Sequence, residues 1–434
     1  MTTTDIKRQF FDSLKRGTGE AFILLNENPD IDFSKLIIKG AVRNYAYDRQ
    51  AERSRADYIY RLIKNAKQKD KIVKSVLTRL QSEKEDDYGL DQMCDLAVMF
   101  FKAGYTTAKQ ALFNRFEKNI LDDYTFCGTG ALMEVAGMEG VLKAAELIGK
   151  ILHEDPEDYE SSWRIDDFQK RHKDIDVYKE LAKAATKNEF IKIYYDSIQK
   201  NKWALPKGKK TKRYTYELIK KRMDEKKLPF ISSKRNSELT ADEVEKLADE
   251  FLAEKDNERK EMYLRFFSSL KFPYDYEPIF KLAKGRNPKN TWLVTFALKA
   301  LKYFRSDELR AFALEQIKKR KNPEDYLILL VSNYKKEDYK LLTEVASRSN
   351  SYDFIHSIVS DFINIYEANP TKECKEPLEL IYNKMNCGIH RRHIVRILIA
   401  NDVLSQRTLK ELEFDSDEGV RNLFQEKKNS TQLQ

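Results

Sequence analysis

Apolar residues in the C-terminal part of the chain recur with the spacing of an α-helix. Two sets occupy positions i, i+3, i+4, i+7, i+8 and i+11: Leu293, Phe296, Ala297, Ala300, Leu301 and Phe304, and then Ile355, Ile358, Val359, Phe362, Ile363 and Tyr366. This spacing places the side chains on one face of a helix with 3.6 residues per turn. No comparable alternation typical of strands competes with it, so the pattern predicts an all-α fold.

Helix-starting and helix-ending signals divide this part of the chain at short intervals. They are Ser306 before Asp307 and Glu308, Asn322–Pro323, Asn369–Pro370, and Asp415 with Glu418, which together resemble a capping box. Helices of about 10 to 17 residues, joined by short turns, are therefore expected from about 290 to 426. Because one helix pair cannot bury its apolar face alone, such pairs must stack on their neighbours.

The same residues carry a resemblance to a known repeat class. The segment Leu409–Glu426 resembles the second-helix region of HEAT-type repeats, with Asp415 or Asp417 at the turn and Val420–Arg421 in the next helix. Thr291–Lys319 is similar to a full helix pair of that class. The resemblance covers about the last 150 residues. It implies a right-handed α-solenoid of stacked helical hairpins, a class that usually binds partners along a concave face.

The rest of the chain also predicts helices, with less regular units. We expect helices over 48–80 and 90–116, and close helix approach over 127–149, where small residues alternate with apolar ones. Thr240 and Glu243 form a capping box before an acidic helix. The expected organisation is an N-terminal helical region (1–155), a middle helical region with a basic loop and helix (156–275), and HEAT-like repeats (276–430).

Composition agrees with a large helical protein. Gly and Pro together account for 24 of 434 residues, about half the usual share, so turns with special dihedral angles are scarce. Hydrophobic residues make up 41% of the chain, enough for a substantial core. We find no apolar run of signal-peptide or membrane-spanning length. The four widely spaced cysteines indicate reduced, core-filling thiols, so we expect a cytoplasmic protein without membrane contact.

One segment holds the entire surplus of positive charge. Residues 200–235 contain fourteen Lys or Arg and three acids, a net charge of +11 against +9 for the whole chain. Lysine and arginine neutralise phosphates, and aromatic rings stack on unpaired bases. The candidate nucleic-acid-binding residues are Lys207, Lys209, Lys210, Lys212, Arg213, Lys220, Lys221 and Arg222, with Trp203 and Tyr214. A solvated loop followed by a charged surface helix is the alternative, with the tyrosines facing the core.

Other motifs give little support to metal or cofactor binding. Cys387-x-x-His390-x-x-His393, with Cys374 upstream, contains zinc-type ligands. On a helix, however, positions 387 and 393 are rotated about 120° apart, so we expect no metal site. A basic spot formed by Arg391, Arg392 and His393 is the preferred interpretation. The G-x-G at 128–130 follows no predicted strand, so no cofactor is expected.

One enzyme hypothesis remains beside the binding hypotheses. Trp163 and Asp167 are four residues apart, an arrangement similar to the aromatic residue and Asp of HEAT-like alkylpurine DNA glycosylases. A packed Trp beside a surface Asp is the alternative. Since no other catalytic constellation is recognisable, we expect a non-enzymatic scaffold that binds an unidentified protein or other macromolecule. Binding of DNA or RNA is the second hypothesis, and a DNA glycosylase is the third.

Overall fold

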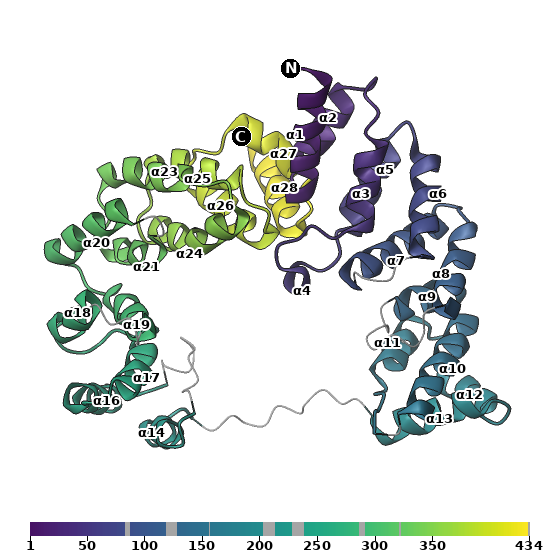
Figure 1. Ribbon diagram of the computed structural model, residues 1–434, viewed down its shortest axis with the longest axis horizontal. Helices are drawn as coiled ribbons and strands as arrows, with labels where there is room; N and C mark the ends of the chain where they lie inside the picture. Colours follow the sequence, from purple (N-terminus) through teal and green to yellow (C-terminus); the bar gives the residue numbers. More distant parts are fainter. Residues whose placement is uncertain are drawn as a thin grey trace. The chain divides into compact units, whose positions relative to one another are not determined.

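Every regular element in the described part of the chain is helical. The computed structural model describes residues 1–82, 87–118, 128–155, 157–202, 213–227, 238–285, 291–320 and 323–432. Within these ranges there are α-helices and two short 3-10 turns, and no strand (Figure 1). The all-α class predicted from the apolar periodicity is therefore confirmed.

The chain forms two compact units. Unit 1 consists of Met1–Lys207, Asn386–Ile389 and Gln406–Gln434, and unit 2 of Gly208–Met385 and His390–Ser405. Unit 1 is thus assembled from segments far apart in the sequence. The division into 1–155, 156–275 and 276–430 stays a prediction.

Unit 1 contains thirteen described helices from the N-terminal half of the chain and two from its end. They are α1 (Thr3–Arg16), α2 (Glu20–Glu27), α3 (Ser34–Val42), α4 (Arg49–Glu52), α5 (Ala56–Asn65), α6 (Lys69–Leu80), α7 (Asp87–Lys102), α8 (Thr107–Lys118), α9 (Thr129–Ala136), α10 (Met138–Glu154), α11 (Trp163–Arg171), α12 (Val177–Ala185), α13 (Glu189–Lys200), α27 (Gln406–Leu412) and α28 (Glu418–Gln432).

Two helices expected from the sequence are broken. The segment 48–80 forms three helices instead of one, because Arg53 adopts a positive φ of 60° and Ala66 an extended conformation. The segment 90–116 is divided at Gly104, which has a φ of 96°. Both segments are therefore helical as expected, but turns divide each of them into shorter helices.

Small residues do allow close helix approach in the 127–149 segment, as predicted. A Cβ atom on Gly149 of α10 would lie 1.9 Å from the carbonyl oxygen of Phe190 in α13. A Cβ atom on Gly140 would lie 2.4 Å from the carbonyl oxygen of Leu132 in α9. A side chain at either glycine would prevent the helices from approaching this closely. The core beside these contacts includes Ile148.

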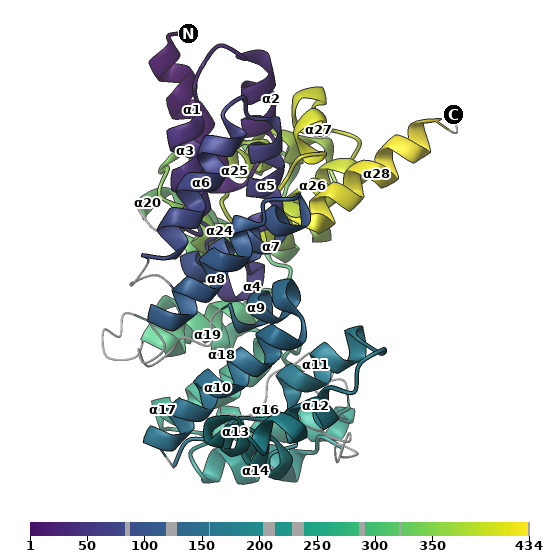
Figure 2. The ribbon, with the colours of Figure 1, turned by 90° about the vertical axis from the view of Figure 1, so that its right-hand side faces the viewer.

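The last two helices pack on the first two. The backbone N–H of Ser416 donates to the carbonyl of Gly17, and the rings of Phe414 and Phe22 stack with centroids 5.1 Å apart. We call these contacts between the α1–α2 turn and the α27–α28 turn the terminal junction. The expected cap of α28 is corrected here: Asp417, rather than Asp415, accepts from the N–H of Val420. Figure 2 shows α28 leaving this junction and ending clear of the other helices of unit 1.

The terminal junction buries an acidic side chain. Glu411 of α27 is almost fully buried beside Glu20. Burial raises the pKa of Glu411 to about 7, with repulsion from Glu20 acting in the same direction and Arg407 and Arg16 opposing it. The carboxyl group is therefore easier to ionise in the unfolded chain than in the folded one.

We expect unit 1 to lose stability as the pH rises from about 4.5 to 8. Because the folded pKa is raised, this stability is fully present below the unfolded pKa and is lost as the pH rises through the folded pKa, by about 3 kcal/mol. Glu411→Gln should flatten this part of the curve of unfolding free energy against pH, measured by urea denaturation. Glu413→Gln, which changes an exposed acid two residues later, is the control and should leave the curve unchanged.

Unit 2 consists of helices that stack on one another. Its helices are α14 (Tyr216–Asp224), α16 (Ala241–Ala253), α17 (Asn257–Phe267), α18 (Glu277–Lys284), α19 (Thr291–Leu301), α20 (Asp307–Lys319), α21 (Glu324–Leu327), α22 (Leu330–Asn333), α23 (Tyr339–Ser347), α24 (Tyr352–Ala368), α25 (Lys375–Tyr382) and α26 (Gly388–Ala400, from His390 on). Helix α19 contacts α17, α18 and α21, and α24 contacts α21, α22 and α25. This stacking is compatible with a helical repeat fold.

Several local predictions for unit 2 are confirmed. Ser306 caps α20 by accepting from the N–H of Glu308, and Thr240 forms a full capping box with Glu243. Helix α24 ends at Asn369. All six apolar residues of the second periodic set are buried, as are the first five of the set that begins at Leu293. The sequence-based periodicity therefore locates the core of this unit.

Candidate functional site

The structure describes only half of the predicted nucleic-acid-binding residues. Lys207, Lys209, Lys210, Lys212 and Trp203 lie outside the described residues. The other five lie on α14 and in the turn before it: Arg213, Tyr214, Lys220, Lys221 and Arg222.

Helix α14 has one buried and one charged face. Tyr214, Ile219 and Met223 are buried, with only 1% of Tyr214 exposed, so its ring belongs to the core and is not exposed for stacking. Lys221 lies on the other face, with 72% of its side chain exposed. The burial of Tyr214 therefore agrees with the alternative interpretation, in which the tyrosines of this segment face the core.

Two of the predicted basic residues are bound to acids of α16. Arg213 Nη2 lies 2.5 Å from Glu243 Oε2, and Lys220 Nζ lies 2.8 Å from Glu250 Oε2. The hydroxyl groups of Tyr216 and Tyr263 also donate to Glu250, at 2.5 and 2.7 Å. Burial would lower the pKa of Lys220, but hydrogen bonds to Glu250 and Tyr263 raise it overall. Lys220 thus connects α14 to α16 and α17.

Lys220→Gln should therefore affect stability more than anion binding. Loss of the partly exposed bond to Glu250 should lower the free energy of unfolding by about 1 kcal/mol, measured by urea denaturation. Lys221→Gln is the control and should change it by less than about 0.5 kcal/mol, because its nearest carboxylate is 4.0 Å away and exposed. Equal losses in the two variants would contradict this assignment.

The Trp163–Asp167 pair lies on the exposed surface of α11. The Arg164 guanidinium lies 4.8 Å from the centroid of the Trp163 ring, which is 46% exposed. Asp167 accepts a hydrogen bond of 3.1 Å from Arg171. These contacts are those of an ordinary helix surface and give no support to the glycosylase hypothesis.

The Cys-His motif differs from its expected geometry. Cys387 precedes α26 instead of lying on it, so the helical rotation argument does not apply to it. In unit 2, the His390 ring meets His356 edge-on at 4.6 Å, and His393 Nδ1 lies 3.8 Å from Glu367. The expected basic spot is wrong for Arg391, which is fully buried.

The cysteines agree with their expected role where the structure describes them. Cys94, Cys374 and Cys387 are all buried, as core-filling thiols would be. Burial raises the pKa of Cys374 to about 11, so this thiol is a weak nucleophile at neutral pH. Cys127 lies outside the described residues.

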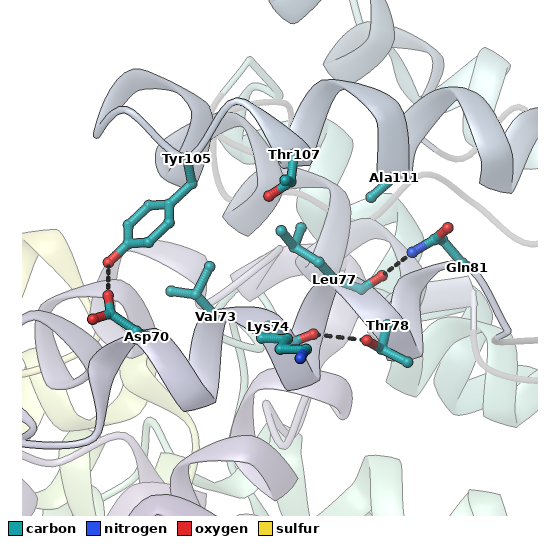
Figure 3. Close-up of a pocket in the computed structure, with 9 residues that line it drawn as sticks. All are labelled: Asp70, Val73, Lys74, Leu77, Thr78, Gln81, Tyr105, Thr107 and Ala111. Carbon is teal, nitrogen blue, oxygen red and sulfur yellow. Dashed lines mark hydrogen bonds between the residues drawn. The ribbon is translucent and has the colours of Figure 1, made fainter.

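A shallow cleft of about 330 Å³ lies between α6 and α8 (Figure 3). Val73, Leu77 and Ala111 line it with apolar atoms. At one end the Tyr105 hydroxyl donates to Asp70 at 2.5 Å, which raises the pKa of Tyr105. The lining hydroxyl and amide groups of α6 are bonded to carbonyls of their own helix, as Figure 3 shows. This cleft therefore offers mainly apolar contact.

A larger cleft of about 500 Å³ lies among α5, α7, α9 and α11, and we call it the α7–α9 cleft. It is lined by Ser54, Ala56, Asp57, Asp95, Val98, Met99, Lys102, Gly130, Ala131, Glu134 and Arg171. Both signs of charge and an apolar wall are thus present. No sequence motif marked it, because its lining comes from four helices that are separated along the sequence.

In unit 2, helix α19 exposes an aromatic surface that we call the α19 ridge. Trp292 is 61% exposed and stacks on Phe296, with ring centroids 5.9 Å apart. The Arg265 guanidinium and Lys299 Nζ lie 5.4 and 5.6 Å from the centroid of the Phe296 ring. An exposed tryptophan is typical of protein-binding surfaces, and here the buried ring beneath Trp292 also contacts two cationic groups.

Charged residues without direct ion pairs lie beside the α19 ridge. Burial raises the pKa of Asp361 in α24 to about 7, although Lys299 and Lys302 favour its charged form. Within the described part of the chain, none of these three side chains forms a direct ion pair.

Comparisons with known proteins identify no family. No protein-family model and no curated protein matches the chain. A solved structure titled "Crystal Structure of Engineered Protein" matches with 13% identity over 98% of this chain and 94% of that chain, at a TM-score of 0.17. A likeness at this score carries no argument about fold or function. Among the described helices, none has the length and apolar character needed to cross a membrane.

Proposed function

We propose that the chain is a HEAT-like, right-handed α-solenoid that acts as a non-enzymatic scaffold and binds a protein partner through the α19 ridge. The exposed Trp292, stacked on Phe296, whose ring contacts Arg265 and Lys299, is the observation that carries this proposal. The stacking of helices in unit 2 supports the repeat architecture. Action in the cytoplasm is part of the same proposal.

The turn before α28 supports the proposed HEAT-like character. Arg421 donates to the carbonyls of Asp415 and Ser416, at 2.7 and 3.0 Å. Val420 is fully buried. The Asp and Val-Arg residues that suggested the resemblance thus fix the turn and anchor the helix. Fold alone does not select a partner, so the surface chemistry of α19 has to be tested directly.

The test compares two exposed tryptophans. Trp292→Ala and Lys299→Glu should each reduce capture of a specific partner from native lysate at least tenfold, because aromatic and cationic side chains dominate binding energy. Trp163→Ala removes an exposed ring from unit 1 and should leave capture unchanged. Thermal unfolding checks that each variant folds. Equal capture by Trp292→Ala and the unmodified protein would overturn the use of the α19 ridge.

A nucleic acid is the second partner that we propose, because residues 200–235 carry a net charge of +11. Fluorescence anisotropy with labelled DNA and RNA across a salt series would test it. Changing Lys207, Lys209, Lys210, Lys212 and Arg213 to Gln should make the salt dependence shallower. Absence of binding even at low salt would leave the protein scaffold as the single proposal.

A further inference from the structure

We propose that the α7–α9 cleft of unit 1 binds a small primary amine whose ammonium group pairs with Asp95. This site is separate from the α19 ridge and independent of the scaffold proposal. The inference rests on the charge balance of the cleft, on its lining and on its volume.

The other charged residues that line the cleft already have counter-ions. Glu134 pairs with Lys102 at 2.9 Å and with Arg171. Asp57 pairs with Arg61 at 3.1 Å. These pairs leave little net charge on the walls that they occupy.

Asp95 is the exception among these lining residues. No cation in the described part of the chain forms an ion pair with its carboxylate, and the nearby Ser54 side chain favours its charged form. Asp95 is exposed at the surface of the cleft, so its carboxylate is accessible to a bound cation. Partial desolvation raises the pKa of Asp95, and the negative charge of Asp91 adds to this effect. A bound cation would stabilise the ionised carboxylate and oppose both effects.

The lining favours an organic cation over a metal ion. Calcium and magnesium need about six or more oxygen ligands, whereas Asp95 and Ser54 supply one carboxylate and one hydroxyl. An ammonium group donates only three hydrogen bonds, which these groups and nearby water can accept. Val98, Met99 and Ala131 provide an apolar wall for an alkyl stem. The volume of about 500 Å³ is within the range of small-molecule sites.

A substitution of Gly130 can test whether a ligand occupies this cleft. It lies in the first turn of α9 and lines the cleft, and a Cβ atom built on it would meet no other atom within 4 Å. A larger side chain at this position should therefore occupy the cleft without overlapping its walls. Filling the cleft and removing the Asp95 charge are two independent changes.

The experiment measures binding of hexylamine to the full chain by isothermal titration calorimetry at pH 7.5. Hexanol and hexanoate have the same alkyl stem and serve as neutral and anionic controls. We expect hexylamine to bind at least tenfold more tightly than either. Asp95→Asn should weaken its binding at least tenfold, and Gly130→Phe should abolish it. Asp242→Asn, which changes an exposed acid of α16, should leave binding unchanged.

Thermal unfolding of each variant separates a lost site from a lost fold. The proposal is overturned if hexanol binds as tightly as hexylamine, or if correctly folded Asp95→Asn and Gly130→Phe bind it like the unmodified protein. Should Asp95→Asn fail to fold, Gly130→Phe alone decides whether the cleft is occupied.

Discussion

Replacing Arg55 with alanine should lower the free energy of unfolding of unit 1 by about 3–5 kcal/mol, the largest effect that we expect from a single change. Arg55 and Glu52 form an ion pair of 2.9 Å in which each side chain is only 5% exposed. Arg55 also donates to the carbonyls of Lys15 and Asn386, at 2.8 and 2.6 Å. Its removal would leave the Glu52 carboxylate buried without this partner.

The same buried pair allows a decisive control. Glu52 accepts from the N–H of Gly388 at 2.9 Å, so Glu52→Ala should also be strongly destabilising. The double variant should lose less than the sum of the two single changes, because it leaves no lone buried charge. Arg8→Ala removes an exposed pair with Asp5 and should cost less than about 0.5 kcal/mol in urea denaturation. A loss below about 1 kcal/mol for Arg55→Ala would show that the pair is not buried in solution.

Gly19→Ala should lower the free energy of unfolding by about 2–3 kcal/mol through steric overlap alone. Gly19 has an ordinary φ of −68°, so alanine imposes no backbone strain there. Its Cβ atom, however, would lie 1.9 Å from the carbonyl oxygen of Glu411, across the terminal junction. The α27–α28 turn would have to move away from the α1–α2 turn to relieve this overlap.

Gly130→Ala is the matched control for this change. Gly130 lies within α9, and a Cβ atom there would contact no other atom. Because alanine favours a helix over glycine, this substitution should raise the free energy of unfolding by about 0.5–1 kcal/mol. Limited proteolysis gives a second measurement, because a weakened junction should expose the chain before α27 to cleavage. Equal stability of the two variants would mean that α27 does not pack on the α1–α2 turn.

The local part of the fold could be predicted from the sequence because its causes are local. The apolar spacing located the core face of α24, and the caps at Thr240 and Ser306 fixed two helix starts. The break at Arg53 could not be predicted, because a non-glycine residue with positive φ gives no sequence signal. Helix periodicity is a property of neighbouring residues, whereas chain direction depends on distant contacts.

The candidate sites were less predictable for the same reason. The charge sum over 200–235 gave no indication that Glu243 and Glu250 of α16 lie against Arg213 and Lys220. The carboxylate of Asp95 acquires its significance from the three other helices of its cleft. The net charge of a segment can be summed from the sequence, whereas the acidic residues that pair with it are identified only from the folded structure.

The terminal junction also constrains the order of events during protein synthesis. Arg407 and Glu20 are 387 positions apart yet lie 2.7 Å from each other. Helices α1 and α2 therefore leave the ribosome long before their partners α27 and α28 have been translated. Closing so long a segment costs conformational entropy and slows folding. Until then the apolar surface around Phe22 is uncovered and is a natural target for molecular chaperones.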